Sequence, residues 1–446
     1  MAAPRARDRA AAAPLSRKTT VRTRLLIIGV ALAATMIGLA GVDGRHQTGL
    51  FLAITAVASA LYCLAAWTVL RSPTRARSGL WLCLALAAVC RVPLVITEPT
   101  ISDDIYRYVW DGRVQRLGHN PYLSPPADPA LAGLHTPVTR LTSHPELPTI
   151  YPPAAQWFFR GVTAIHESVL ALKLSFVACD ALIVLLLLRW LSRQGQSPWR
   201  VLVYAWNPLV MIEVAGSGHL DALGALLLLV SFLALSERKT LLAALSFMAA
   251  VEVKFLPIVL APMFWRRIRV RDLVLALLFA LAVAAPFFSG SLRSLIGSLP
   301  TYLPKWRFNG PAFALLEHFV RSRWLVALPA VAGLAVATRL RTERLSPSTW
   351  AWPMAAALLL MPTVYPWYLL WMTPYLGALE TLPLLVWTQT VLLTYAVWSV
   401  SVGGGGWHLP WWVPAAEFGG VAAAALWLAV RRIRHPEGSD AAAGGP

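Results

Sequence analysis

Two adjacent carboxylates, Asp103 and Asp104, open the longest polar interval in a sequence that is otherwise strongly apolar. Further along the chain, His219 and Asp221 lie two residues apart, and Lys254 is a cation inside an apolar stretch. A positioned carboxylate can take the proton of a hydroxyl group, and cations stabilise an anionic leaving group. These residue types therefore suit a transfer reaction in which a hydroxyl group attacks and an anion departs.

The aspartates also have a purely structural interpretation. Ser102 is a suitable N-cap, and acidic residues in the first turn that follows favour the helix dipole. Asp103 can form an ion pair with Arg107 four residues later, and Asp111 can do the same from the other side. For Asp111 we favour the ion pair, whereas for Asp103 and Asp104 the sequence supports both interpretations equally.

The other charged candidates have structural alternatives too. Helix capping explains Asp221 as well as catalysis does, and His219 can serve only as a hydrogen-bonding residue. Lys254 can pair with Glu252, although a lysine at a hairpin turn facing protein has little chance to reach solvent. Glu213 lies inside an apolar span, where a carboxylate is costly and needs an arginine partner or a substrate hydroxyl.

Aromatic residues are concentrated in one short stretch late in the chain. Their rings can stack on the faces of sugars. Interfacial belts of Trp and Tyr are so common in membrane proteins, however, that we favour a belt. The residues are Tyr365, Trp367, Tyr368 and Trp371.

Neither the cysteines nor the histidines indicate a metal site. The cysteines fall inside apolar runs, where they behave as small hydrophobic residues, and the histidines of the polar interval lack metal-ligand spacing. The sequence supports no metal and no certain cofactor, and it leaves a divalent cation open. These residues are Cys63, Cys83, Cys90, Cys179, His119, His135 and His144.

The composition places the chain in a membrane. Of its 446 residues, 57% are hydrophobic and only 13% are charged, and the mean hydropathy is +0.60. Repeated long apolar runs in such a sequence are typical of transmembrane helices. The net charge of +18 lies mostly in short Lys and Arg runs between these segments, as in cytoplasmic loops. We therefore expect membrane lipid, and no nucleic acid, as a partner.

Charge and apolar runs divide the chain into three parts. Residues 1–24 hold seven Lys or Arg residues and predict a disordered basic cytoplasmic tail. Residues 25–430 form one transmembrane domain, and residues 431–446 form a second disordered cytoplasmic tail. We therefore expect an all-α polytopic protein of the plasma membrane, with about 12–14 transmembrane helices and both termini in the cytoplasm.

The distribution of arginines places two polar loops on the outer face of the membrane. Residues 98–166 form an ordered loop with short amphipathic helices, because its aromatic residues supply apolar surface to bury. Its last part, residues 151–166, is too short to span the membrane and predicts an interfacial or re-entrant helix. Residues 289–321 form a second outer loop. Two pairs of short helices, meeting near Lys254 and near Tyr365, keep the neighbouring basic loops inside.

Six sequence motifs extend over about residues 80–375. They are Ser102-Asp103-Asp104-Ile105-Tyr106-Arg107-Tyr108-Val109-Trp110-Asp111-Gly112, Gly118-His119-Asn120-Pro121-Tyr122, Tyr151-Pro152-Pro153, Trp206-Asn207-Pro208-Leu209, Gly218-His219-Leu220-Asp221 and Lys254-Phe255-Leu256-Pro257. Together they resemble motifs of the GT-C superfamily of glycosyltransferases. The likeness is greatest to bacterial mannosyltransferases that use polyprenyl-phosphate mannose.

The resemblance implies a GT-C-like fold and a catalytic base in the first large outer loop, at Asp104 or Asp103. It implies transfer of a hexose, with mannose favoured, from a polyprenyl-phosphate donor to an acceptor glycan or glycolipid on the outer face. In-line attack would invert the configuration of the sugar. Two spans precede the loop-bearing one, and Asp-Asp replaces the Asp-Glu or Glu-Asp of some relatives. The second departure leaves open which carboxylate is the base.

The remaining candidates receive roles from their charge and shape. Cations and a histidine on the outer face would bind the donor phosphate, whereas polar and aromatic residues would contact the substrates. The phosphate-binding candidates are Lys254, Arg307 and His219, and the substrate-binding candidates are Arg107, Asp221, Glu213, Tyr151, Tyr365 and Trp367.

Two other functions compete with the enzyme. A lipid-linked sugar flippase or secondary transporter without transferase activity would place its charges near the membrane midplane and often show two related halves. The charges here cluster at one edge, and the sequence shows no related halves. A scaffolding subunit would carry the same costly polar residues without using them.

Overall fold

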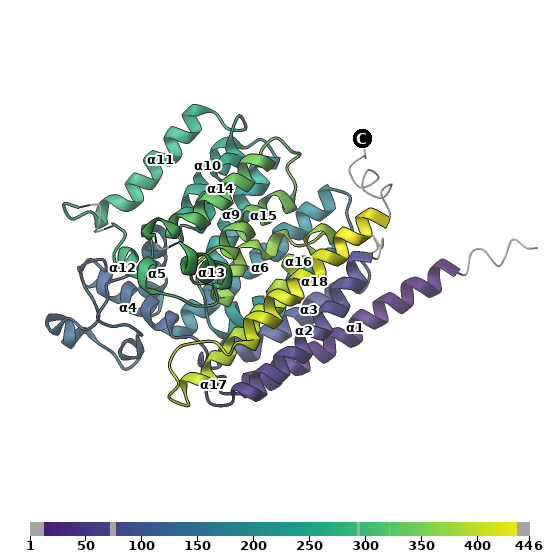
Figure 1. Ribbon diagram of the computed structural model, residues 1–446, viewed down its shortest axis with the longest axis horizontal. Helices are drawn as coiled ribbons and strands as arrows, with labels where there is room; N and C mark the ends of the chain where they lie inside the picture. The colour runs from purple at the N-terminus through teal and green to yellow at the C-terminus, as the bar shows by residue number, and fades with distance from the viewer. Residues whose placement is uncertain (1–12, 72–76, 292–294, 321, 435–446) are drawn as a thin grey trace, which may run out of the picture.

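The computed structural model describes residues 13–71, 77–291, 295–320 and 322–434, and these residues form helices joined by loops, without a β-sheet (Figure 1). Seven helical segments are long and apolar enough to cross a membrane, and three shorter apolar helices accompany them. The prediction of an all-α polytopic membrane protein is therefore confirmed. The long segments are Val21–Ala40, Thr48–Arg71, Val169–Arg193, Val270–Phe287, Arg323–Leu340, Leu379–Ser401 and Trp412–Arg434. The shorter helices are Leu80–Ile96, Asp221–Ser236 and Thr240–Val251.

The first half of the chain contains the first polar loop, residues 98–166, and the helices before and after it. Helices α1 and α2 form a hairpin, and α1 also packs on α3. Helices α4 and α5 belong to the first loop and pack on each other. The elements are α1 (Ala13–Ala40), α2 (Thr48–Arg71), α3 (Leu80–Ile96), α4 (Asp104–Arg116), α5 (Pro153–Ile165), α6 (Val169–Arg193), α7 (Leu202–Ala205), α8 (Pro208–Val210), the π-helical turn η4 (Met211–Gly216), α9 (Asp221–Ser236) and α10 (Thr240–Val251).

The second half adds the second polar loop, residues 289–321, and the last helices. Helix α14 packs on α15, and α18 packs along α16 (Figure 1). The elements are the 3-10 helix η5 (Leu256–Phe264), α11 (Val270–Ala284), α12 (Leu299–Lys305), α13 (Pro311–Phe319), α14 (Leu328–Leu340), α15 (Pro347–Leu359), the 3-10 helix η9 (Pro366–Tyr375), α16 (Leu382–Thr390), the 3-10 helix η11 (Val391–Ala396), α17 (Val397–Ser401) and α18 (Trp412–Arg434).

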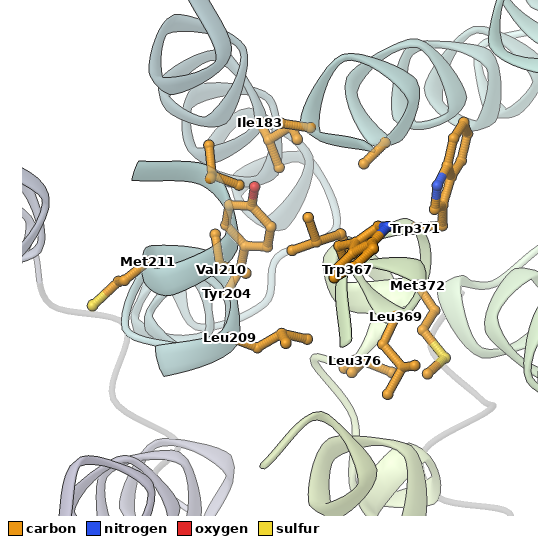
Figure 2. Close-up of a cluster of buried hydrophobic side chains, with 14 of the residues drawn as sticks. Ile183, Tyr204, Leu209, Val210, Met211, Trp367, Leu369, Trp371, Met372 and Leu376 are labelled. Carbon is orange, nitrogen blue, oxygen red and sulfur yellow. The ribbon is translucent and has the colours of Figure 1, made fainter. Parts of the chain in front are cut away.

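The apolar segments differ in how far they are enclosed by protein. In its apolar window, Leu379–Ser401 is 61% buried within the protein, whereas α18 is only 17% buried. The first segment therefore belongs to the protein core, and α18 presents apolar side chains that lipid must cover. Figure 2 shows part of the core, where η9, with Trp367 and Trp371, packs beside α8, with Leu209 and Val210.

The two helix ends correct the predicted tails in part. Helix α1 begins at Ala13 and α18 continues to Arg434, so both extend into segments predicted to be disordered, 1–24 and 431–446. The first residues of α1 and the arginines in the last turn of α18 include good helix formers, which extend a helix at little cost. Residues 1–12 and 435–446 lie outside the described residues.

The short helices lie where the charge pattern predicts breaks. Helix α10 ends at Val251, and η5 begins at Leu256, so Lys254 lies between them. Helix α5 has 13 residues. Its length is about 20 Å, less than the roughly 30 Å of a hydrocarbon core. It therefore has the length expected of an interfacial or re-entrant helix.

Links that the charge pattern assigns to one side of the membrane contact one another. On the predicted inner side, Arg193 pairs with Glu237, the Thr240 hydroxyl donates to Asp272 over 2.5 Å, and Arg267 donates to the Glu343 carbonyl over 2.7 Å. The links predicted to be outer gather at a separate place, around a cavity.

Candidate active site

A cavity of about 580 Å³ lies among the segments predicted to be outer. Its walls come from the first loop, the second loop, the break after α10, the start of η9 and the segment around α17. The Ser298 hydroxyl donates to the Pro148 carbonyl over 2.9 Å, so the two polar loops are joined beside the cavity. Segments about 300 residues apart in sequence thus line one cavity.

Most of the predicted site residues line this cavity, and three lie behind its wall. The lining residues are Asp103, Asp104, Arg107, Tyr151, Lys254, Arg307, Tyr365 and Trp367. Glu213, His219 and Asp221 are each at most 1% exposed and are not among the lining residues.

Asp104 is the first residue of α4, and its side chain is 30% exposed toward the cavity. Its amide donates to the Ser102 hydroxyl over 3.4 Å, although Asp103 rather than Ser102 occupies the N-cap position. Burial raises the pKa of Asp104 to about 6, helped by the charges of Asp221 and Asp103 and opposed by Lys254 and a Tyr151 hydrogen bond. A carboxylate with this pKa is mostly ionised at neutral pH yet holds a proton well, as a general base requires.

Asp103 has a different environment from its neighbour. Its carboxylate pairs with Arg45, from the link between α1 and α2, rather than with Arg107. The Arg45 guanidinium also lies 4.4 Å from the centre of the Trp398 ring. Asp103 is thus neutralised by a fixed cation, whereas Asp104 has no Lys or Arg in direct contact among the described residues.

The Asp111 side chain serves the structure of the first loop. It accepts hydrogen bonds from Arg107 over 3.1 Å and from the Gln156 amide of α5 over 3.0 Å. Arg107 also donates to the Leu147 carbonyl. As expected, Asp111 forms the ion pair with Arg107, within α4, and its hydrogen bond with Gln156 joins α4 to α5.

Lys254 pairs with Asp221, not with Glu252. Its ammonium nitrogen lies 2.8 Å from the Asp221 carboxylate and 4.0 Å from the centre of the Tyr368 ring. The same Asp221 oxygen accepts a hydrogen bond from the Trp371 indole over 2.6 Å. Asp221 therefore holds Lys254 at the cavity wall, and helix capping does not explain it.

A second group of cations comes from the second loop. Arg307 makes two hydrogen bonds to Glu317, over 2.7 and 3.1 Å, and Lys305 lines the cavity beside it. Cations thus face the cavity from the break after α10 and from the second loop. Such an arrangement favours a bound anion such as a phosphate group.

Four rings form a continuous stack beside the carboxylate. Phe308 stacks on Tyr365 with 4.6 Å between ring centres, Tyr365 on Trp367 with 4.5 Å, and Trp367 on His219 with 4.1 Å. Trp367 and Tyr368 are both only 9% exposed, and Trp371 is fully buried. The predicted aromatic belt is therefore wrong here, because these rings face the cavity and the core rather than a membrane interface.

His219 bridges two carboxyl groups. Its Nδ1 lies 3.7 Å from Asp104 Oδ2, and its Nε2 lies 3.3 Å from Glu213 Oε2. Glu213 is fully buried in η4, and its Oε1 accepts a hydrogen bond from the Tyr395 hydroxyl over 2.6 Å. Neither contact is a hydrogen bond, because 3.7 Å is too long and His219 Nε2 and Glu213 Oε2 have no hydrogen-bond partner among the described residues. His219 thus lies buried between two carboxyl groups behind the cavity wall, and the predicted contact with a donor phosphate is not available at this position.

Several lining residues were not predicted from the sequence. Tyr302 exchanges a hydrogen bond of 2.9 Å with Tyr368, and Trp398 and Trp407 form part of the wall. Trp407 follows a run of four glycines, which was the one signal of a link able to approach other segments closely. Among the described residues, no group of His, Cys, Asp or Glu side chains could hold a metal ion.

A helical membrane protein whose cavity joins a carboxylate, stacked aromatic rings and cations has the features of a membrane-embedded glycosyltransferase. The family model described as the alpha-(1->6)-mannopyranosyltransferase N-terminal domain matches residues 24–268, more than half of the 446-residue chain, and the chain belongs to this family. It is therefore a mannosyltransferase. The match includes Asp104 and Lys254 and ends before the second loop. Comparison with curated proteins and with solved structures gives no significant match.

Proposed function

We propose that this protein transfers mannose from polyprenyl-phosphate mannose to a hydroxyl group of an acceptor glycan or glycolipid, with inversion, on the outer face of the membrane. The family description suggests that the new bond is an α-(1→6) linkage. The observation that carries the proposal is the position of Asp104, whose carboxylate lines the same cavity as the stacked aromatic rings and the cations.

Asp104 is the proposed general base. An acceptor hydroxyl attacks the anomeric carbon, a carbon–oxygen bond forms, and Asp104 takes the hydroxyl proton. The bond from the anomeric carbon to the phosphate oxygen breaks, and its electron pair leaves with the polyprenyl phosphate. In-line displacement converts a β-linked donor into an α-mannoside.

The cations stabilise the leaving phosphate in this proposal. Lys254 faces the cavity on the side of Asp104, and Lys305 and Arg307 face it from the second loop. Preorganised charges of this kind act where negative charge grows in the transition state. Tyr365 and Trp367 offer flat apolar faces on which the sugar can lie.

The proposed orientation of the protein in the membrane follows from the distribution of its basic residues. The arginines of the two loops around the cavity are spread over long polar stretches, whereas the short links on the opposite side are dense in arginine, as cytoplasmic loops are. We therefore place the cavity outside and both termini in the cytoplasm.

Purified protein, supplied with labelled polyprenyl-phosphate mannose and a short α-(1→6)-linked mannoside acceptor, tests the proposal. The expected product is the acceptor extended by one mannose, in an α-(1→6) linkage established by NMR. Asp104→Asn should lower turnover roughly 10²- to 10⁴-fold, the usual contribution of a general base. Near-native turnover by both Asp104→Asn and Asp103→Asn would show that neither carboxylate is the base.

The purified protein reconstituted in proteoliposomes, with the same labelled donor, distinguishes a transferase from a flippase. A transporter would move the labelled lipid across the bilayer without extending any acceptor. Extension of the acceptor, lost in Asp104→Asn, supports the transferase.

A further inference from the structure

Helix α18 carries a buried carboxyl group in a segment that mostly faces lipid. Glu417 is fully buried, although only 17% of the apolar window of α18 is buried within the protein. None of the Lys, Arg and His side chains in the described part of the chain pairs with it. A carboxyl group is costly in such a segment, so its partners indicate what it does.

Glu417 accepts hydrogen bonds from two sides. The indole N–H of Trp387, on α16, donates to Oε1 over 2.7 Å. The side-chain amide of Asn309 donates to Oε1 over 3.1 Å and to Oε2 over 3.0 Å. Asn309 belongs to the second loop, 108 residues before Glu417 in the sequence, and it is itself buried. The carboxyl group thus joins the second loop to α16 and α18.

The backbone before Asn309 runs along the segment that leads into η9. The Phe308 amide donates to the Pro362 carbonyl over 3.0 Å, and the Val364 amide donates to the Phe308 carbonyl over 2.8 Å. Asn309 then has a φ of 53°, in the left-handed region that asparagine adopts more readily than most residues. The hydrogen bonds to Glu417 therefore hold the side chain at a tight turn that directly follows this backbone contact.

The two cations of the second loop precede this turn. Lys305 and Arg307 lie four and two residues before Asn309, and both line the cavity. Arg307 also donates to the Trp306 carbonyl over 2.9 Å, so its guanidinium stays close to the backbone of the segment. At about 3.3–3.6 Å per residue, no more than roughly 14 Å of chain separates the cations from the turn. A shift of the turn therefore moves the cations as well.

We propose that Glu417 and Asn309 are positioning residues that hold Lys305 and Arg307 at the cavity, where these cations bind the phosphate of the donor. Helix α18 then takes part in donor binding, although it lies beyond the family match, which ends at residue 268. This inference rests on the proposed function, because it concerns the phosphate site of that reaction.

The test is the donor dependence of mannose transfer by purified variants. Glu417→Leu removes the acceptor of the Asn309 amide and suits a transmembrane helix. It should lower kcat/KM for polyprenyl-phosphate mannose about fivefold or more, weaken inhibition by polyprenyl phosphate by a similar factor, and leave the KM for the acceptor within about twofold. Glu417→Gln keeps an oxygen that can accept from Asn309, so its values should stay near wild type. If Glu417→Leu does not fold, Asn309→Gly removes the amide, keeps the left-handed backbone and gives the same measurement.

Removal of the cations shows whether Glu417 acts through them. In a Lys305→Gln, Arg307→Gln background, Lys254 still faces the cavity, so residual transfer can be measured. There, Glu417→Leu should lower kcat/KM for the donor by less than about twofold, because the groups that it positions are gone. Damage to the fold as a whole would instead multiply the two losses, since it acts independently of the cations.

Asp272 provides a matched control. It is a buried carboxyl group in the first turn of α11, and it accepts a hydrogen bond from the Thr240 hydroxyl over 2.5 Å. Neither residue lines the cavity. Asp272→Leu makes a similar chemical change near the end of another apolar helix, and it should leave the KM for the donor and the inhibition by polyprenyl phosphate unchanged.

The outcomes separate the two proposals. Wild-type donor kinetics in Glu417→Leu, an equal loss in Glu417→Gln, or a loss that persists in full without the two cations overturns the positioning role, while transfer by the wild-type protein still stands. Absence of mannose transfer by the wild-type protein overturns the proposed function instead. A loss in Glu417→Leu that disappears in the cation-depleted background supports both.

Discussion

Arg45 and Asp103 form an ion pair that ties the α1–α2 hairpin to the start of α4. Arg45 also lies over Trp398, which lines the cavity. This pair distinguishes two adjacent aspartates that are equivalent in the sequence. Asp103 is held by a cation, whereas Asp104 opens into the cavity and contacts His219. The two spans before the loop-bearing helix thus supply a residue that fixes the proposed catalytic loop.

The Arg45–Asp103 pair predicts a modest and shared effect on turnover. Arg45→Ala and Asp103→Asn should each lower kcat several-fold, because the start of α4 loses an anchor while Asp104 keeps its carboxylate. The double variant should be little worse than either single one, because contacting residues do not act additively. Initial rates of the purified variants measure this coupling. Fully multiplicative losses would mean that the two residues act independently.

The pKa of Asp104 predicts an acidic limb in the pH profile. Its pKa is raised to about 6, chiefly by burial. The base acts only when it is ionised, so kcat/KM should be high above this pH and fall tenfold per unit below it. Asp103→Asn removes a nearby negative charge that raises this pKa. The limb should therefore move to lower pH in that variant, and a limb that moved to higher pH would contradict the assignment.

The aromatic stack predicts a graded loss of donor binding at Tyr365. Tyr365→Phe keeps the ring between Phe308 and Trp367, and it should leave the KM for the donor within about twofold of wild type. Tyr365→Ala opens the stack and should raise that KM about tenfold or more, since a ring stacking contact is worth roughly 0.5–1.5 kcal/mol beyond the area it buries. Steady-state rates over a range of donor concentrations give the comparison. Equal effects of the two variants would assign the loss to the hydroxyl group instead.

The residues that sequence reasoning found are those whose charge is rare in their surroundings. Asp104 and Lys254 stand out because carboxylates and cations are costly in an apolar chain, and the structure places both on one cavity. The all-α membrane fold follows from apolar runs of sufficient length. Both inferences need only local sequence.

The partners of these residues depend on tertiary contacts, which local sequence does not contain. Arg45 and Asp103 are 58 residues apart, and the α1–α2 link has the composition of any short polar turn. For Tyr365 and Trp367 the sequence supports both a belt and substrate binding, because aromatic residues at an interface and in a cavity share one sequence signature. Only the packing of η9 against the core distinguishes a cavity wall from a membrane-interface belt.

The Lys254–Asp221 pair allows the structural and catalytic roles of Lys254 to be separated. The Lys254 side chain is 22% exposed, whereas Asp221 is fully buried. Lys254→Met leaves a buried carboxylate without its cation, which should lower the free energy of unfolding by about 3 kcal/mol or more. The combination Lys254→Met with Asp221→Asn removes both charges, and the asparagine oxygen can still accept from Trp371.

We expect the apparent melting temperature to fall in Lys254→Met and to recover in the double variant, whereas mannose transfer should stay at least about tenfold below wild type in both. Thermal unfolding in detergent and initial rates on the same preparations provide the two readouts. Asp221→Asn alone is the control, since it removes the buried charge and leaves the ammonium group of Lys254 in the cavity wall. If the double variant recovered transfer together with stability, Lys254 would serve only to neutralise Asp221, and the leaving phosphate would depend on the cations of the second loop.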